Sequence, residues 1–283
     1  MHTQKLFVSG CFGVMLGCFT GPVLAAQSPL CATLPTWAQL KTALTNSITP
    51  STGANGGLGF NMWGTIVAAD GTVCAVAFSG GDYTSQWFGS RLISAQKAST
   101  GNDFSLGGGS APGGSSFPNG LALSTANLYS AVQPGGSLYG LQASNPVDTD
   151  VAYANTDNGS LSPSFFGTKQ DPLVGLRVGG VNVFGGGLGA YQGGVRVGGV
   201  GVSGDTSCTD HMVAWRLRHR LGLDQFGTVT GVSGDPKHPD NIIFDITPNP
   251  YGGTGISKGG FGHPTCLNNP TPAAVSGLPV VQP

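Results

Sequence analysis

The segment that most constrains the fold is residues 193–219, GGVRVGGVGVSGDTSCTDHMVAWRLRH. Its first part is rich in Val and Gly, as in a β-strand, and a turn of Gly, Ser and Asp follows. The remainder has the spacing of an amphipathic helix, predicted over residues 209–221, and Thr209 and Asp210 suit a helix N-terminus. The segment therefore predicts a strand that turns directly into a helix.

One alternative interpretation of this segment is a dinucleotide-binding site. Gly199, Gly201 and Gly204 form a GxGxxG pattern, and Asp224 follows twenty residues later. The pattern lies late in the chain, however, and no βαβ unit follows it. Because the chain holds 49 glycines, such matches arise by chance. We expect these glycines to form a turn and to allow close packing of the strand against a helix.

The N-terminus predicts an exported protein. His2 and Lys5 precede an apolar run at residues 6–19, and small residues follow, so residues 1–26 are predicted to be a signal peptide. An alternative is a lipobox with an acylated Cys18, although its Leu is displaced by one position. We therefore expect a periplasmic or secreted protein, and no later segment has the ~20 apolar residues of a membrane span.

Composition argues against two classes of partner. Only 9% of the residues are charged and the net charge is −1. Without a basic stripe, the chain has no electrostatic surface for nucleic acid or an anionic membrane. Recurring runs of Val, Leu, Ile and Phe argue against disorder.

Hydrophobic periodicity predicts an α+β domain with an antiparallel sheet. The predicted helices are 36–47, 83–98 and 209–221, with short pieces at 125–132 and 138–143; the predicted strands are 61–69, 72–79, 174–184 and 194–203. Asp70 and Gly71 predict a type I′ hairpin turn. Residues 185–189 are expected to be a glycine break, residues 99–117 a long loop and residues 145–170 a surface insertion.

Four cysteines remain after residue 26, and an even number in an exported chain favours disulfides over free thiols or a metal site. If helix 36–47 and the first strand run in opposite directions, the hairpin leaves Cys74 close to Cys31. We predict the disulfides Cys31–Cys74 and Cys208–Cys266. The second would tie the C-terminal tail to the start of the late helix.

Three stretches resemble the GlcG/HbpS family of haem-binding proteins, which includes the C-terminal domain of PduO-type proteins. GGGLGAYQGGVRVGGVGVSGDTSCTDHMVA is similar to the family motif GGGxPxxxxGxxxGAxGVSGGxxxxDxxxA, with Asp210 at the acidic position. SRLISAQKAST, which contains Lys97, is similar to ARDKAYTA, and TIVAADGTVCAVAFSGG resembles VVDAGGHLVAFxRMDG. The resemblance covers residues 34–223 with a break between residues 101 and 171.

The resemblance implies a profilin-like fold with a five-stranded antiparallel sheet flanked by helices. It places one domain at residues 27–223, with an insertion at about 101–171, before a Gly/Pro-rich extension at 224–283. The chain departs from the family pattern in two places. The family has Pro where Leu188 or Gly189 stands, and the Met of its hairpin is absent around Phe78 and Ser79.

By this resemblance we expect an exported, non-catalytic protein that binds non-covalent haem b or another small ligand. Haem iron needs an axial donor, an apolar slot and cations for the propionates. The predicted binding residues are His211 as the iron ligand, together with Lys97, Met212 and Arg216. His219 lies about 80° from His211 around the helix, so both cannot bind one small ion.

Several of these residues could instead have purely structural roles. Lys97 could be a surface residue, and Trp87 and Phe88 are expected in the core rather than in a ligand platform. Cys208 near His211 could suggest a nucleophile and base, but a disulfide-bonded cysteine cannot serve and no catalytic motif is present. The alternative function is an accessory module that forms homo-oligomers or docks on an exported redox or sensor protein.

Overall fold

The structure is a computed structural model that describes residues 28–48, 55–110, 115–153, 162–253, 255–270 and 275–283. The predicted signal peptide, residues 1–26, and the alternative acylation site at Cys18 lie outside the described residues. Within the described part of the chain, no helix is long and apolar enough to cross a membrane.

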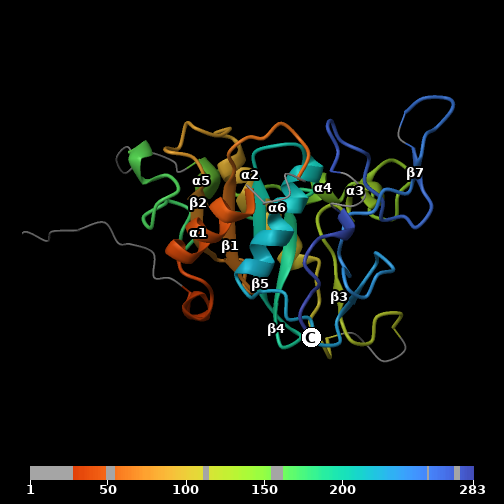
Figure 1. Cartoon of the computed structure of the whole chain (residues 1–283), viewed down its shortest axis with the longest axis horizontal. Helices are drawn as coiled ribbons and strands as arrows, with labels where there is room; N and C mark the ends of the chain where they lie inside the picture. The colour runs from red at the N-terminus through yellow and green to blue at the C-terminus, as the bar shows by residue number, and fades with distance from the viewer. Residues whose placement is uncertain (1–27, 49–54, 111–114, 154–161, 254, 271–274) are drawn as a thin grey trace, which may run out of the picture.

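The centre of the fold is a four-stranded antiparallel sheet (Figure 1). Its strands lie in the order β2-β1-β5-β4, with bounds Val73–Phe78, Trp63–Ala68, Val195–Ser203 and Gly187–Gln192. Strands β1, β2 and β5 agree with the predicted strands 61–69, 72–79 and 194–203. The prediction of an α+β fold with an antiparallel sheet is confirmed, whereas the main sheet has four strands among the described residues instead of five.

The predicted strand 174–184 accounts for this difference. Only its first residues run along the sheet edge, where Val73 N–H donates to Leu176 O at 2.8 Å and Gly175 N–H donates to Val73 O at 2.9 Å. Gly175 already has a positive φ of 88°, and Gly179 and Gly180 follow with φ angles of 66° and 77°. A strand cannot continue through such a backbone, so the expected fifth strand is reduced to two hydrogen bonds.

Strand β4 occupies a segment predicted to be a glycine break. Its Gly187 and Gly189 lie opposite Gly201 and Gly199 of β5. Glycine weakens a strand in isolation, but here the absence of side chains leaves room for a helix on this part of the sheet. The break prediction was wrong because the glycines serve close packing.

Helices cover both faces of the sheet (Figure 1). Helices α1, Trp37–Ile48, and α6, Ser207–Arg220, share one apolar cluster with Ile66 of β1. Helix α2, Ser90–Asp103, shares a second cluster with Val67, the next residue of β1. Neighbouring strand residues point to opposite faces, so the sheet lies between α1 and α6 on one side and α2 on the other.

Helix α2 approaches β5 backbone to backbone. A Cβ atom at Gly199 would lie 2.2 Å from Ala98 O, and one at Gly201 would lie 2.0 Å from Ser94 O. These are two glycines of the GxGxxG pattern. Their role in this fold is to let a helix rest on the strand, as the sequence predicts.

Two predicted boundaries shift. Helix α2 begins at Ser90 and not at residue 83, because Asp82 accepts a hydrogen bond from Thr84 N–H at 2.8 Å and holds a turn there. Helix α6 begins at Ser207, with Thr206 as its N-cap. The hairpin turn also differs from type I′, since Gly71 has a φ of 81° while Asp70 is not among the residues with positive φ.

Both predicted disulfides are present, Cys31–Cys74 and Cys208–Cys266. The segments outside the sheet form short elements. These are the 3-10 helices η1 (Pro29–Thr33) and η3 (Pro163–Phe165), the helices α3 (Tyr129–Val132), α4 (Leu141–Ser144) and α5 (Thr149–Tyr153), and the strands β3 (Leu121–Ala122), β6 (Thr230–Gly231), β7 (Ile246–Thr247) and β8 (Ile256–Ser257). Strand β3 pairs with β6 and β7 with β8, which makes two small extra sheets.

Replacing Gly201 with alanine tests the close approach of α2 and β5. The new Cβ would overlap Ser94 O and lie 2.5 Å from Ala98 N, both backbone atoms, so the helix must move away. We expect the free energy of unfolding to fall by about 3 kcal/mol or more in urea titration. Gly89→Ala is the matched control, because nothing lies within 4 Å of its Cβ position. Equal effects of the two substitutions would contradict this account.

Candidate ligand-binding site

Lys97 and Asp210 join the two stretches that carry the sequence resemblance. Lys97 Nζ of α2 lies 2.7 Å from Asp210 Oδ2 of α6, and both side chains are almost fully buried. Asp210 Oδ1 accepts the N–H of Asp205 at 2.9 Å, and Lys97 also donates to Val202 O at 3.3 Å. Burial raises the pKa of Asp210 to about 6, although Lys97 opposes that rise. The predicted binding residue Lys97 is thus part of an internal ion pair.

His211 lies one residue further along α6 and is completely buried. Its Nε2 lies 3.1 Å from both Asn241 Oδ1 and the backbone nitrogen of Ile242. Its Nδ1 has no hydrogen-bond partner among the described residues. Burial lowers the pKa of His211 to about 4, so the ring is neutral at pH 7.

The two remaining predicted binding residues are also internal. Met212 belongs to the apolar cluster between α6 and the sheet. Arg216 donates to the side-chain oxygen of Asn55 and, at 3.4 Å, to Met212 O. The structure therefore brings the predicted residues together around α6 but packs them into the interior, and none of the four lines the pockets described below.

A pocket of about 370 Å³ lies at the start of α2. We call it the aromatic pocket; its lining residues are Phe88, Gly89, Arg91, Leu92, Ile93, Gln96, Ala152, Tyr153 and Phe166. The rings of Phe88 and Phe166 lie 5.4 Å apart, and Tyr83 packs edge-on against both. The pocket combines the first turn of α2 with the inserted segment that carries α5.

Arg91 forms the base of this aromatic wall. Its guanidinium makes a buried ion pair with Asp171, with Nε 2.8 Å from Oδ2, and stacks 4.4 Å from the centre of the Phe166 ring. Asp171 also accepts the N–H of Gly167 at 2.7 Å. This network fixes Phe166, so the pocket has a rigid aromatic side.

Sequence reasoning missed the residues that line this pocket. Trp87 and Phe88 were expected in the core, but both are 52% exposed, because the chain turns here before α2 begins. Tyr153 and Phe166 come from a segment predicted only to be a surface insertion. The available signal was the presence of large aromatic residues in an otherwise polar stretch.

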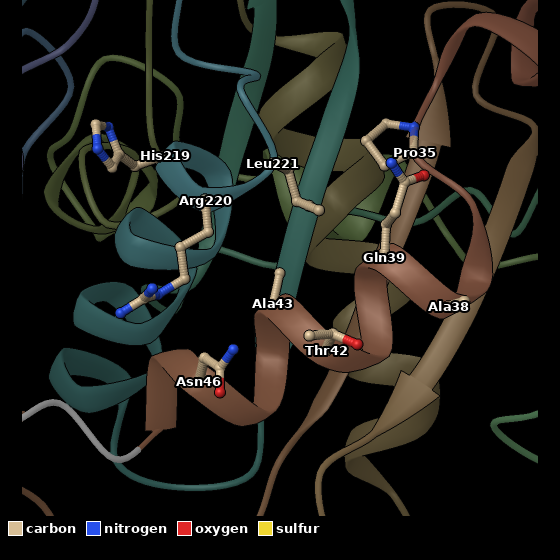
Figure 2. Close-up of a pocket in the computed structure, with 9 residues that line it drawn as sticks. All are labelled: Pro35, Ala38, Gln39, Thr42, Ala43, Asn46, His219, Arg220 and Leu221. Atoms are coloured by element: carbon tan, nitrogen blue, oxygen red, sulfur yellow. The ribbon is translucent and has the colours of Figure 1, made fainter.

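A second hollow, of about 730 Å³, lies between α1 and the end of α6 (Figure 2). Ala43, Asn46 and Arg220 line it, and His219 stands at its edge with its ring directed away from α1. The ring Nδ1 lies 2.6 Å from Asp224 Oδ2. A metal ion bound by the other ring nitrogen would lie outside this hollow.

A serine and a histidine meet at the start of α6. Ser207 Oγ lies 2.7 Å from His263 Nε2, which is the spacing of a nucleophile and its base. The N–H of the next residue, Cys208, would have to stabilise an oxyanion, but it donates instead to Cys266 Sγ at 3.1 Å. Burial also lowers the pKa of His263 to about 4. The donor that acyl transfer would need beside Ser207, the Cys208 N–H, is therefore already engaged.

Removing Lys97 tests the internal ion pair. In a Lys97→Met variant the Asp210 carboxylate is buried without its partner, so we expect a loss of about 3–5 kcal/mol in the free energy of unfolding. Arg177→Met is the control, because the Arg177–Asp70 pair is exposed and should be worth at most about 1 kcal/mol. Urea titration of both variants would contradict the account if they lose the same amount.

Acid should destabilise the protein through two of its buried histidines, His211 and His263. His211 and His263 have folded pKa values of about 4, below the usual 6.5. Between these two pH values the unfolded state binds more protons than the folded state, so the free energy of unfolding decreases as the pH is lowered. Asp210 has its folded pKa raised to about 6 and acts in the opposite direction. For these three groups together, the expected net loss from pH 7 to pH 4 is about 3 kcal/mol. His211→Gln should nearly abolish it in urea titrations at the two pH values, and a wild-type protein more stable at pH 4 would refute the assignment.

No family model and no curated protein matches this chain. Solved structures do match. They include a PduOC:haem complex, at 20% identity and a TM-score of 0.39 over 65% of this chain and 90% of the other. ORFY of Klebsiella pneumoniae, a DUF336 protein, matches at 21% identity and a TM-score of 0.39, over 71% of this chain and 95% of the other. A double mutant of Streptomyces reticuli HbpS matches at 15% identity and a TM-score of 0.33, over 76% of this chain and 98% of the other. The matched structures thus belong to the GlcG/HbpS-like family, DUF336, which the sequence motifs resemble.

Proposed function

We propose that the protein binds haem, or another flat and largely apolar ligand, in the aromatic pocket. The observation that carries this proposal is the pair of rings, Phe88 and Phe166, at a pocket of about 370 Å³ whose lining is mostly apolar. Small-molecule sites are apolar hollows of roughly 300–1,000 Å³ with a few polar groups. We further propose that the polypeptide itself catalyses no reaction.

The lining residues fit a porphyrin in two respects. The face of a flat ring system can stack on Phe88 and Phe166. Tyr153, which is 73% exposed, is the one lining residue of a type that ligates haem iron. Bound haem would supply redox or gas-binding chemistry, while the protein holds the ring and limits its contact with water.

The propionates would have to face solvent. Arg91 is the one cation that lines the pocket, and its guanidinium is already paired with Asp171. Gln96 remains as a neutral donor at the rim. This favours a ligand that is only partly enclosed, at the lower end of the volume range given above.

The sequence prediction of His211 as the iron ligand requires a different conformation. Its side chain is fully buried, and Nε2 lies against Asn241 and Ile242. Iron could reach Nε2 only if the segment at residues 241–242 moved away from α6. His211 therefore enters the experiment below as a separate variant.

Assembly is the second candidate function, and one observation favours it. Phe60 and Trp87 stack edge-on, 5.2 Å apart, and both are exposed, as are Phe88 and Tyr153 of the aromatic pocket. Exposed apolar patches also mark contacts between proteins. Light scattering of the ligand-free protein separates the roles, because a strict monomer that binds hemin would argue against assembly.

Hemin titration followed by the Soret band tests the leading proposal. The wild-type protein should show a saturable shift at micromolar hemin with one site per chain. Phe88→Ala and Phe166→Ala should each raise the Kd about tenfold, since each removes a stacking surface worth about 1.4 kcal/mol. Tyr153→Phe should alter the position of the Soret band if its oxygen binds the iron.

Two controls make the result interpretable. Phe184 is 51% exposed, nearly the same as Phe88, but lies outside the pocket, so Phe184→Ala should leave the Kd unchanged within twofold. His211→Ala with an altered spectrum would transfer the donor role to His211. The absence of a saturable shift in the wild type would eliminate haem as the ligand, and equal effects of Phe184→Ala and Phe88→Ala would eliminate this pocket.

A further inference from the structure

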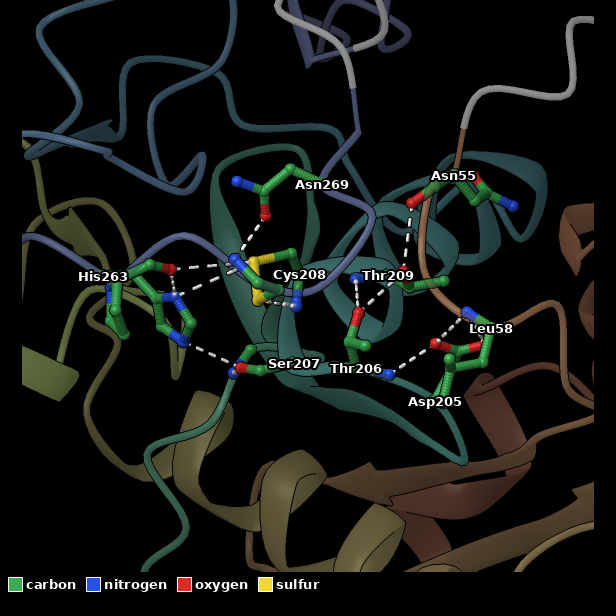
Figure 3. Close-up of a disulfide and its surroundings, with 12 residues drawn as sticks. Asn55, Leu58, Asp205, Thr206, Ser207, Cys208, Thr209, His263 and Asn269 are labelled. Atoms are coloured by element: carbon green, nitrogen blue, oxygen red, sulfur yellow. Dashed lines mark hydrogen bonds between the residues drawn. A yellow bond between two sulfur atoms is a disulfide. The ribbon is translucent and has the colours of Figure 1, made fainter.

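The Cys208–Cys266 disulfide lies beside His263 at the start of α6 (Figure 3). One potential ligand atom from each of Cys208, Cys266 and His263 lies within 4.8 Å of the other two. In the described part of the chain, no other group of three His, Cys, Asp or Glu side chains comes together in this way. Two sulfurs and an imidazole nitrogen are ligands that Zn²⁺ prefers.

His263 is held in a position from which it can face the sulfurs. Its Nε2 lies 2.7 Å from Ser207 Oγ, and its Nδ1 lies 2.7 Å from Pro264 O and 4.0 Å from Cys208 Sγ. Figure 3 shows one ring nitrogen directed toward Ser207 and the other toward the disulfide. The contact with Ser207 is a suitable outer partner, because a ligating histidine usually hydrogen-bonds through its second nitrogen.

The two cysteines also have surroundings that suit thiolates. Cys208 is the second residue of the 14-residue helix α6, where the helix dipole stabilises negative charge. Its own N–H donates to Cys266 Sγ at 3.1 Å. The Cα atoms are 6.0 Å apart, and Cys266 lies in a C-terminal segment without regular structure that can adjust when the bond opens.

We propose that Cys208, Cys266 and His263 bind one Zn²⁺ ion when their disulfide is reduced. The sulfurs then need to separate to about 3.8 Å, which follows from Zn–S bonds of about 2.3 Å at a tetrahedral angle. Three protein ligands leave the fourth position for water. The site is closed by oxidation, so metal binding and the disulfide exclude each other.

The chemical steps balance with a dithiol as reductant. The Cys208–Cys266 bond breaks, each sulfur gains an electron and a proton, and the dithiol is oxidised to its own disulfide. Zinc binding then releases the two thiol protons to solvent. His263 now donates from Nδ1 to Pro264 O at 2.7 Å and accepts from Ser207 Oγ at Nε2. To bind the metal through Nδ1 it loses that proton and takes one up on Nε2, so the ring stays neutral and Ser207 Oγ becomes the acceptor.

The first disulfide supplies an internal comparison. Cys31 and Cys74 join η1 to β2, and no comparable group of His, Asp or Glu side chains surrounds them within the described residues. Reduction of both disulfides should therefore create a single metal site. Metal binding is thus predicted to depend on the position of His263 as well as on the presence of two free thiols.

Cobalt titration of the full chain tests the proposal. After reduction, the wild-type protein should bind one Co²⁺ with tetrahedral ligand-field bands and thiolate-to-cobalt charge transfer, and Zn²⁺ should displace it. The oxidised protein should bind at least 100-fold more weakly. The double variant Cys208→Ser/Cys266→Ser should lose the charge-transfer bands, while Cys31→Ser/Cys74→Ser should bind within threefold of the wild type.

His263→Ala separates a designed site from two chance thiols. It should weaken binding by at least tenfold, and circular dichroism should show that the variant is folded. If that variant does not fold, the comparison of oxidised and reduced wild type still decides. Failure of the reduced wild type to bind Co²⁺, with or without loss of its fold, would overturn the proposal, and so would equal binding by Cys208→Ser/Cys266→Ser.

Discussion

The backbone of helix α2 lies directly on strands β4 and β5, and the rest of the structure depends on this close approach. A Cβ atom at Gly187 would lie 2.2 Å from Lys97 O, so no larger residue fits there without moving the helix. Gly186 leaves a gap beside the sheet, since its Cβ position is 3.0 Å from Asp210 Cβ and 3.3 Å from Lys97 Nζ. Lys97 can therefore reach from a helix on one face to Asp210 on a helix of the other. The glycines and the Lys97–Asp210 ion pair together hold α2 on one face of the sheet and α6 on the other.

The parts of the fold that depend on side-chain periodicity could be predicted from the sequence. Strands β1, β2 and β5 and helices α1 and α6 follow from it, and the chain direction indicated the pairing of Cys31 with Cys74. Strand β4 could not be predicted, because glycines at the positions that contact α2 remove the alternating apolar side chains by which a strand is recognised in a sequence. The start of α2 was misplaced because an Asp82 turn competes with helix in the same amphipathic stretch.

The candidate site was harder to predict than the fold for a related reason. Residues that mark the resemblance, such as Lys97 and Asp210, are buried in the joint between layers, so they identify the architecture and not the surface that meets a ligand. The aromatic pocket is built where α2 begins and where the insertion returns to the domain with Phe166. A motif search detects residues of the first kind, which are buried between the layers. The second kind depends on long-range packing, such as the Arg91–Asp171 pair that fixes Phe166, which no local pattern shows.

The first turn of α6 contacts both the sheet layers and the C-terminal segment. Because these contacts are separate, a reducible disulfide is compatible with a stable helix. On the inner side, Asp210 accepts the N–H of Asp205 and pairs with Lys97. Cys208, which is also fully buried, is bonded to the C-terminal segment. The helix cap itself comes from Thr206, whose Oγ1 accepts the N–H of Thr209 at 3.4 Å, and it does not require the disulfide. Opening the disulfide therefore removes one link between α6 and the C-terminal segment, while the cap, the ion pair and contacts such as Trp215 Nε1 to Pro279 O at 2.9 Å do not depend on it. In the proposed reduced state, the two sulfurs and His263 rearrange around a metal ion while these contacts hold α6.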